Sequence, residues 1–351
     1  MRASVIKRLA EAGEASKSEL NPTQTFIGWV NGKAISWYRG QYAACGIMVD
    51  AAEEIPTCAI AARQFRDLMT GLFEDDKEIK LTSVRNSLVV ATGRRRATFR
   101  FEGEPDFTEY WRRLEMIQDK GVLVDREVFT REISIASEIV ASSLSMPILT
   151  GIRLAAGADR VGIQSANGMS LMFQSAIPAV TGDVRASVVV PTAEFKSALS
   201  TMRGKELHLI IDTRSVILRS ADAFFVLPVM SGTWPSLQHV ISSLVFADEV
   251  TLPSGIIRDV STAVRIYTAD SDVRFSPTER NEVVISTMES EAGQFVEAIA
   301  GKLSREYRFD VADLAIAAKI ADGDVTMAVG PSMARISTLD RTLYVQQRFV
   351  A

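Results

Sequence analysis

Histidine and cysteine are scarce in this sequence, with two of each in 351 residues. The sequence therefore offers few side chains from which a histidine or cysteine metal centre, or a catalytic triad, could form. His208 lies in a predicted strand and His239 follows Trp234-Pro235, and neither has a second histidine or an acidic residue at ligand spacing. Glycine-rich phosphate-binding motifs and a Cys-x-x-Cys pair are also missing. The sequence thus predicts no enzyme, no metal site and no cofactor.

Long hydrophobic runs are missing as well. No segment approaches the ~20 apolar residues of a membrane span, and no apolar stretch with a cleavage site follows the basic N-terminus, which argues against secretion. Cys45 and Cys58 lie in apolar, strand-like segments, so we predict buried free thiols rather than a disulfide. These features favour a cytoplasmic protein, and the length allows two or three domains.

One pattern occurs three times along the chain. Apolar residues at i, i+3, i+4 and i+7 begin at Phe65, Phe195 and Leu314, so each stretch predicts a short helix with one buried face. The copies lie about 130 and about 120 positions apart, far more than the ~20–50 residues of a solenoid repeat. Whole domains have therefore been duplicated.

Three strand-like runs follow each of these helices. They are rich in β-branched and aromatic residues, and several alternate in polarity as half-buried strands do. The runs cover residues 77–84, 87–92 and 96–101, then 206–212, 216–220 and 224–230, and finally 325–329, 334–338 and 342–349.

The front half of each repeat is compatible with one helix followed by strands. The predicted helices cover residues 2–18, 126–143 and 253–266, and Asn31-Gly32 predicts a type I′ hairpin turn. Short connections make the sheets antiparallel. We therefore predict an α+β fold of three tandem domains, 1–116, 117–245 and 246–351, each with two helices packed on antiparallel sheets.

The order and spacing of four short segments resemble the bacterial sliding clamp family, the β subunit of the replicative DNA polymerase. The segments are Ile60–Phe65, Met146-Pro147-Ile148-Leu149-Thr150-Gly151-Ile152, Val188-Val189-Val190-Pro191 and Gly232-Thr233-Trp234-Pro235. Members of this family form head-to-tail homodimeric rings around duplex DNA, with helices facing the hole. The resemblance implies the same fold and function here, which makes the chain a processivity factor that tethers a polymerase.

A lining that lets DNA slide should attract phosphates without reading bases, which lysine and arginine do. The candidate DNA-binding residues lie on polar flanks of the predicted helices: Lys7, Arg63, Arg66, Arg131, Lys196, Arg203, Arg258 and Arg265. An ordinary solvated helix face remains the alternative for each. The helix at 125–143 does not fit simply, because its acidic residues outnumber its basic ones.

The resemblance also implies a cleft between the second and third domains, where peptides of the polymerase, the clamp loader and repair proteins would bind. The corresponding residues are Leu149, Ala166, Gly168, Met169, Leu171, Pro235, Val240, Val345 and Phe349. The family's histidine and arginine in the 166–171 turn are Met169 and Ser170 here, and its cleft tyrosine aligns with Asp313. Its Met-Pro-Met ending is Gln347-Arg348-Phe349, so the peptide preference should differ. Such divergence is compatible with a phage or mobile-element clamp, and the same residues could simply be interdomain core.

Two other functions stay open at this point. One is a ring scaffold for transcription or repair that binds no replicative polymerase. The other is a β-rich structural protein, such as a virion component, that binds no DNA. The mass of the assembly and the binding of a polymerase peptide would separate them.

Overall fold

The computed structural model describes most of the chain, and the account below concerns the described residues. These are residues 1–18, 24–41, 43–75, 77–103, 105–117, 121–142, 145–157, 159–180, 186–253, 255–267, 272–287, 289, 293–321 and 323–348.

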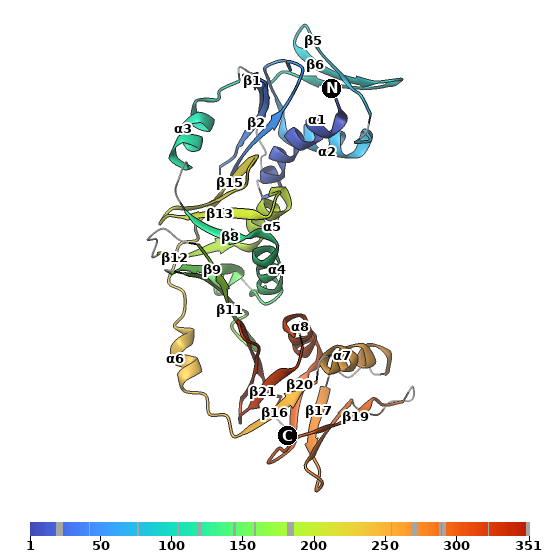
Figure 1. The fold of residues 1–351 in the computed structure, drawn as a ribbon, viewed down its shortest axis with the longest axis vertical. Helices are drawn as coiled ribbons and strands as arrows, with labels where there is room; N and C mark the ends of the chain where they lie inside the picture. Colours follow the sequence, from blue (N-terminus) through green and yellow to red (C-terminus); the bar gives the residue numbers. More distant parts are fainter. Residues whose placement is uncertain are drawn as a thin grey trace. The chain divides into compact units, whose positions relative to one another are not determined.

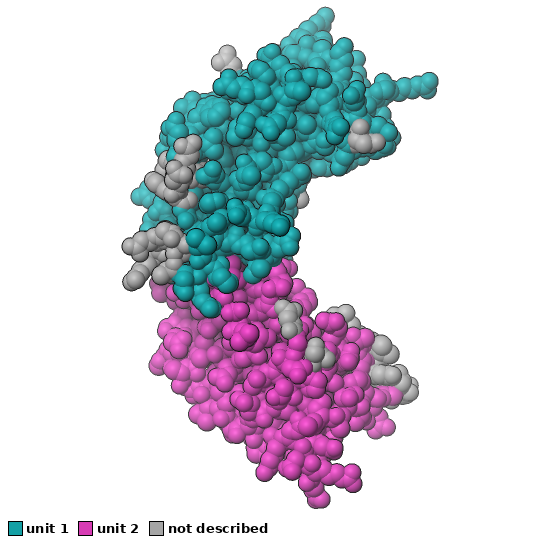
Figure 2. Space-filling model, viewed as in Figure 1, with its two compact units in different colours: residues 1–130, 155–160, 178–230 teal, residues 131–154, 161–177, 231–351 magenta. Residues whose placement is uncertain are grey.

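The chain divides into two compact units (Figure 2). Unit 1 comprises residues 1–130, 155–160 and 178–230, and unit 2 comprises residues 131–154, 161–177 and 231–351. The division passes through the middle repeat, so each unit combines parts of two consecutive repeats. Each unit is described by itself below.

Unit 1 contains the first repeat and the second half of the middle repeat. The first repeat consists of α1 (Ala3–Ala10), η1 (Glu11–Ser18), β1 (Gln24–Val30), β2 (Lys33–Arg39), β3 (Ala44–Asp50), β4 (Cys58–Ala61), α2 (Ala62–Leu72), β5 (Lys80–Val84), β6 (Ser87–Thr92) and β7 (Arg95–Arg100). The connector helix α3 (Thr108–Ile117) follows. The middle repeat contributes β8 (Val122–Asp125), β12 (Ala186–Pro191), α5 (Thr192–Thr201), β13 (Glu206–Ile211), β14 (Ser215–Arg219) and β15 (Ala223–Pro228).

Unit 2 contains the first half of the middle repeat and the third repeat. Helix α4 (Arg126–Ser137) leads into η2 (Pro147–Thr150), β9 (Gly151–Ala156), β10 (Arg160–Ala166) and β11 (Leu171–Pro178), and α6 (Leu237–Ser242) is the second connector. The third repeat consists of β16 (Asp248–Leu252), α7 (Ile256–Tyr267), β17 (Asp272–Pro277), β18 (Glu282–Thr287), β19 (Val296–Ala300), β20 (Tyr307–Asp310), α8 (Val311–Ile320), β21 (Val325–Val329), β22 (Met333–Ser337) and β23 (Arg341–Gln346).

The threefold pattern predicted from the sequence is confirmed. Helices α2, α5 and α8 each follow a short strand and precede three antiparallel strands (Figure 1). The hairpin turn at Asn31-Gly32 has positive φ at both residues, 51° and 80°, as a type I′ turn requires. Two predicted helices are shorter than expected. The first is α-helical only to Ala10 and continues as a 3-10 helix, and α4 ends at Ser137.

The sheets join the front strands of one repeat to the back strands of the next. In unit 1 the strand order is β4-β1-β2-β3-β15-β14-β13-β8, so that β3 of the first repeat pairs with β15 of the middle repeat. In unit 2 the order β9-β10-β11-β23-β22-β21-β16 places β11 of the middle repeat against β23 of the third. Two smaller sheets, β5-β6-β7 and β19-β18-β17-β20, complete the fold.

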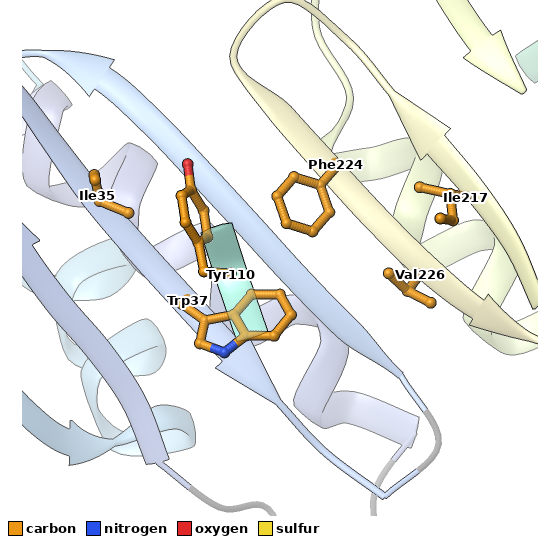
Figure 3. Packing of buried hydrophobic residues seen from close by; sticks show 6 residues of the cluster. All are labelled: Ile35, Trp37, Tyr110, Ile217, Phe224 and Val226. Atoms are coloured by element: carbon orange, nitrogen blue, oxygen red, sulfur yellow. The ribbon is translucent and has the colours of Figure 1, made fainter. Parts of the chain in front are cut away.

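A connector helix covers one face of each joined sheet. In unit 1, Tyr110 of α3 packs with Trp37 and Phe224 (Figure 3), and all three are almost fully buried. Gly46 on β3 is required here, since a Cβ atom would lie 2.5 Å from the Phe224 ring. Burying each such aromatic side chain contributes about 2–3 kcal/mol, so this cluster ties the two repeats together. Helices α1, α2 and α5 lie on the other face (Figure 1).

Ion pairs formed by two buried arginines also hold the joined sheets to their helices. In unit 1 the Arg8 guanidinium donates to the carboxylate of Asp222, at 2.8 and 2.9 Å, and to the Thr201 carbonyl oxygen at the end of α5. In unit 2 the Arg341 guanidinium donates to the Glu132 carboxylate, with its closest contact at 2.8 Å, and to the Ile320 carbonyl oxygen at the end of α8. Each arginine therefore neutralises a carboxylate and satisfies a helix C-terminus in the interior.

The two cysteines are buried free thiols, as predicted. Burial raises the pKa of both, and that of Cys58 to about 12. Among the described helices, none combines the length and apolar character needed to cross a membrane.

Candidate partner surface and nucleic-acid interface

A tight turn between β10 and β11 contains four of the predicted cleft residues, Ala166, Gly168, Met169 and Leu171. The Asn167 side-chain oxygen accepts hydrogen bonds from the backbone N–H groups of Met169, Ser170 and Leu171, at 2.9, 2.9 and 3.0 Å. Gly168 has φ 75°, a conformation that glycine adopts without strain. The predicted turn at 166–171 is therefore present, and it holds Met169 at its tip with 85% of its surface exposed.

An apolar cluster lies beside this turn in unit 2. Its buried members are Ala141, Leu149, Ala166, Met172, Leu237 and Tyr344, with Ile148, Trp234, Ile241, Leu244, Phe246 and Met333 packed around them. Predicted cleft residues Leu149 and Ala166 belong to this cluster, and Pro235 follows Trp234 in it. Leu149 and Ala166 are themselves almost fully buried in this cluster, and their role in a cleft stays a prediction.

Leu171 and Val345, also predicted for the cleft, have a different position. They face each other in the β11–β23 register, and their neighbours Met172 and Tyr344 form the next pair. Because successive side chains of a strand project to opposite faces, Leu171 and Val345 lie on the face away from the cluster. Both are almost fully buried. They support the strands and offer almost no surface to a partner.

Connector α6 covers its sheet less completely than α3 covers the corresponding one. Helix α3 has ten residues and α6 has six. Leu237 of α6 is buried in the cluster, whereas Val240 on the same helix is 44% exposed. Met146 and Met169 are also exposed beside the cluster. The apolar cluster with this exposed rim is called the partner surface below.

A polar cavity of about 550 Å³ lies at the end of β23. Its walls are formed by Ser170, Asp310, Ala312, Asp313, Gln346, Gln347 and Arg348. Four of these, Ser170, Asp313, Gln347 and Arg348, are positions where the sequence departs from the clamp pattern. Phe349, another such position, lies outside the described residues.

The predicted DNA-binding residues of unit 1 fall into two groups. Lys196 on α5, Arg63 on α2 and Arg203 after α5 are exposed, with Arg203 in an ion pair with Glu11. Lys7 and Arg66 form the second group, whose side chains are held by other residues of the protein. The Lys7 ammonium lies 2.5 Å from the Asp75 carboxylate. The side chain of Arg66 is only 10% exposed and donates to Asp67 and to the Gly13 carbonyl oxygen. Packing against η1, invisible in a helical pattern, withdraws Arg66 from solvent.

In unit 2, Arg131 on α4 and Arg258 on α7 have exposed side chains. Arg265 is also on α7, but its side chain lies outside the described residues. The acidic excess of α4 is largely neutralised, because Glu132 pairs with Arg341 and the Glu138 carboxylate lies 2.5 Å from the Lys319 ammonium. Charge counting on one helix missed these partners, which come from the third repeat.

Strands β7 and β19 are two of the edge strands of the described sheets. Strand β7 pairs only with β6, and strand β19 pairs only with β18. The exposed residues of β7 include Arg95, Arg96 and Arg100, and those of β19 include Val296 and Glu297. An open edge of this kind is a template for pairing with another strand. No group of three or more metal-ligating side chains occurs in the part of the chain searched, the described residues.

Comparison with known proteins gives a consistent result. The family model described as DNA polymerase III beta subunit, N-terminal domain, matches residues 121–237. A search of curated protein sequences gave no match.

Among solved structures, the DNA polymerase sliding clamp from Bacillus subtilis aligns with a TM-score of 0.80 and 13% identity, covering 100% of this chain and 98% of its own. The DNA polymerase III beta subunit from Thermotoga maritima gives 0.80 and 15%, covering 100% and 99%. The Helicobacter pylori beta clamp bound to a DNA ligase peptide gives 0.79 and 11%, covering 100% and 99%. At such low identity these likenesses establish the fold.

Proposed function

We propose that this chain, which has the fold of bacterial sliding clamps and carries a DNA polymerase III beta subunit domain at residues 121–237, closes with a second copy into a ring around duplex DNA. In this proposal the ring slides without reading sequence, and its partner surface tethers a polymerase. The domain limits 1–116, 117–245 and 246–351 belong to the same proposal, as does work in the cytoplasm.

The observation that carries the proposal is the way the sheets are joined. The front strands of the first repeat pair with the back strands of the middle repeat, and the front strands of the middle repeat pair with the back strands of the third. This rule leaves the front strands of the third repeat, ending at β19, and the back strands of the first, ending at β7. Two chains arranged head to tail would pair each β19 with a β7 and leave neither edge open.

The internal junctions also predict the register of this contact. Ala223, Arg341 and Arg95 are the first residues of β15, β23 and β7, and the first two face Ile47 and Ser175. Arg95 should therefore face the residue of β19 that corresponds to Ile47.

The hairpins preceding the junctions identify that residue. Lys33 pairs with Asp50, and Glu282 pairs with Ala300, the last residue of β19. Outside these pairs the N–H groups of Ala51 and Gly301 donate to the carbonyl oxygens of residues 32 and 281. Ile47 comes three residues before Asp50, and Glu297 comes three residues before Ala300. Glu297 of β19 therefore corresponds to Ile47 of β3. In the proposed ring, Arg95 would therefore lie opposite Glu297 of the second copy, as an attractive cross-strand pair.

Contact with DNA would come from exposed cations of the helical layers. Arg63, Lys196, Arg203, Arg131 and Arg258 are the candidates that keep exposed side chains. These five exposed cations, in a chain with a net charge of −4, suit weak, salt-dependent contacts, which permit sliding. The closed ring would then keep the protein on the DNA.

Tethering is proposed for the partner surface. Its exposed Met169 and Val240 flank a buried apolar cluster, an arrangement suited to a short peptide that inserts apolar side chains. The structurally similar Helicobacter pylori clamp was solved with a DNA ligase peptide.

A retention assay tests enclosure directly. The protein is diluted to separate chains, mixed with nicked circular plasmid and concentrated so that it reassembles on the DNA. We expect a fraction to remain with the circle in high salt during gel filtration and to leave when a restriction enzyme opens the circle. Equal loss from circular and linear plasmid would contradict the proposal.

A further inference from the structure

The polar cavity and the partner surface are neighbours along one strand. Tyr344 belongs to the apolar cluster, and Gln346, which lines the cavity, is two residues further along β23 on the same face. The Gln346 N–H donates to the carbonyl oxygen of Ser170, which follows Met169 in the turn. A segment bound on the partner surface would therefore reach the cavity with its next few side chains.

The charged residues of this cavity differ in how many ion-pair and hydrogen-bond partners they have. The Arg348 guanidinium lies 2.5 Å from the Asp272 carboxylate and also pairs with Asp310. Asp310 in addition accepts the Ala312 N–H at 2.7 Å as the N-cap of α8. Asp313 has only the Ser170 hydroxyl as a direct partner among the described residues, and no ion pair there.

The surroundings of Asp313 make its charge costly. Burial raises the pKa of its carboxyl group, and the nearby Asp310 acts in the same direction, while Ser170 and Arg348 act against them. A carboxylate with reduced hydration gains most from an approaching cation. An apolar side chain would remove its remaining water without replacement, and an anion would meet two carboxylates and an arginine that is already paired.

We propose that the protein segment bound at the partner surface carries a lysine or arginine whose cation pairs with Asp313 in the polar cavity. This inference rests on the proposed tethering function and specifies its partner: a peptide with apolar anchors next to one basic side chain. The cavity of about 550 Å³ has room for such a side chain, and the polar side chain of Gln346 also lines it.

Peptide selection followed by affinity measurement tests the inference. Random linear peptides displayed on phage are selected on the wild-type protein and on Asp313→Lys. We expect wild-type selections to combine apolar residues with one fixed lysine or arginine, and Asp313→Lys selections to replace that residue by an acidic one. Because the second result is a gained preference, a folding defect cannot produce it.

The strongest selected peptide is then labelled and measured by fluorescence anisotropy. Exchanging its basic residue for norleucine should weaken binding about tenfold, as expected for a partly buried ion pair. Asp313→Asn should weaken the basic peptide equally and leave the norleucine peptide unchanged. Asp259→Asn, the same change on the exposed face of α7, is the matched control and should have no effect.

The outcomes separate this inference from the proposed function. Apolar peptides without a fixed base, or identical selections on both proteins, would overturn the role of Asp313 and leave tethering intact. If no apolar peptide is enriched, or if Val240→Asp does not reduce binding, tethering itself fails.

Discussion

Reversing one charge at the proposed contact between copies should separate the chains. Glu297→Arg would place two arginines opposite each other, because the proposed register sets Glu297 against Arg95 of the second copy. An attractive cross-strand pair contributes up to ~1 kcal/mol, and like charges cost a similar amount. Each contact should therefore weaken by ~2 kcal/mol. A two-chain ring has two such contacts, so association weakens by ~4 kcal/mol, or about a thousandfold in Kd.

Sedimentation equilibrium across a range of concentrations measures this change. Arg95→Glu combined with Glu297→Arg restores opposite charges and should recover most of the association. Glu279→Arg, in the exposed turn between β17 and β18, is the matched control and should leave the mass unchanged. An undisturbed dimer in Glu297→Arg, or a double variant no tighter than the single ones, would refute the register. Wild-type protein that stays a monomer at all concentrations would refute ring closure.

Three further predictions concern DNA contact and stability. Lys196→Ala should lower the slope of log Kd against log salt for DNA by about one per chain, whereas Lys80→Ala on β5 should not; filter binding at several salt concentrations measures both. Glu132→Gln removes the carboxylate charge that pairs with the buried Arg341. It should lower the free energy of unfolding, measured in urea, by about 3–5 kcal/mol, more than replacing both residues by apolar ones. The raised pKa of Cys58, about 12 against 9.0, favours the protonated thiol in the folded protein. The Cys58 contribution to stability should therefore fall by up to ~1.4 kcal/mol per pH unit between pH 9 and 12. Cys58→Ala should remove this share of the pH dependence in alkaline urea titrations and leave the share of Cys45.

Local patterns in the sequence were enough to find most of the repeated elements. Strands 87–92 and 325–329 have the predicted limits, since their alternation and flanking turns are local signals. The connector helices α3 and α6 were missed, although Tyr110 and Leu237 anchor the two clusters. Their apolar residues make sense only against strands from two different repeats.

Among the site residues, too, local features were predictable from the sequence and long-range contacts were not. The turn at 166–171 was predictable because an asparagine and a glycine determine it nearby in sequence. The burial of Arg66 against Gly13 was not, and neither was the pairing of Glu132 with Arg341, which lies 209 positions away.

The sequence by itself determined the threefold repetition, the α+β class and the segments that resemble sliding clamps, because periodicity and turn chemistry act over a few residues. Only the tertiary structure decided which charges are neutralised, which apolar residues stay exposed at the partner surface, and that β7 and β19 are the edges left over when the repeats join. Those properties depend on contacts between residues 53 to 209 positions apart in the examples above, and no local pattern encodes them.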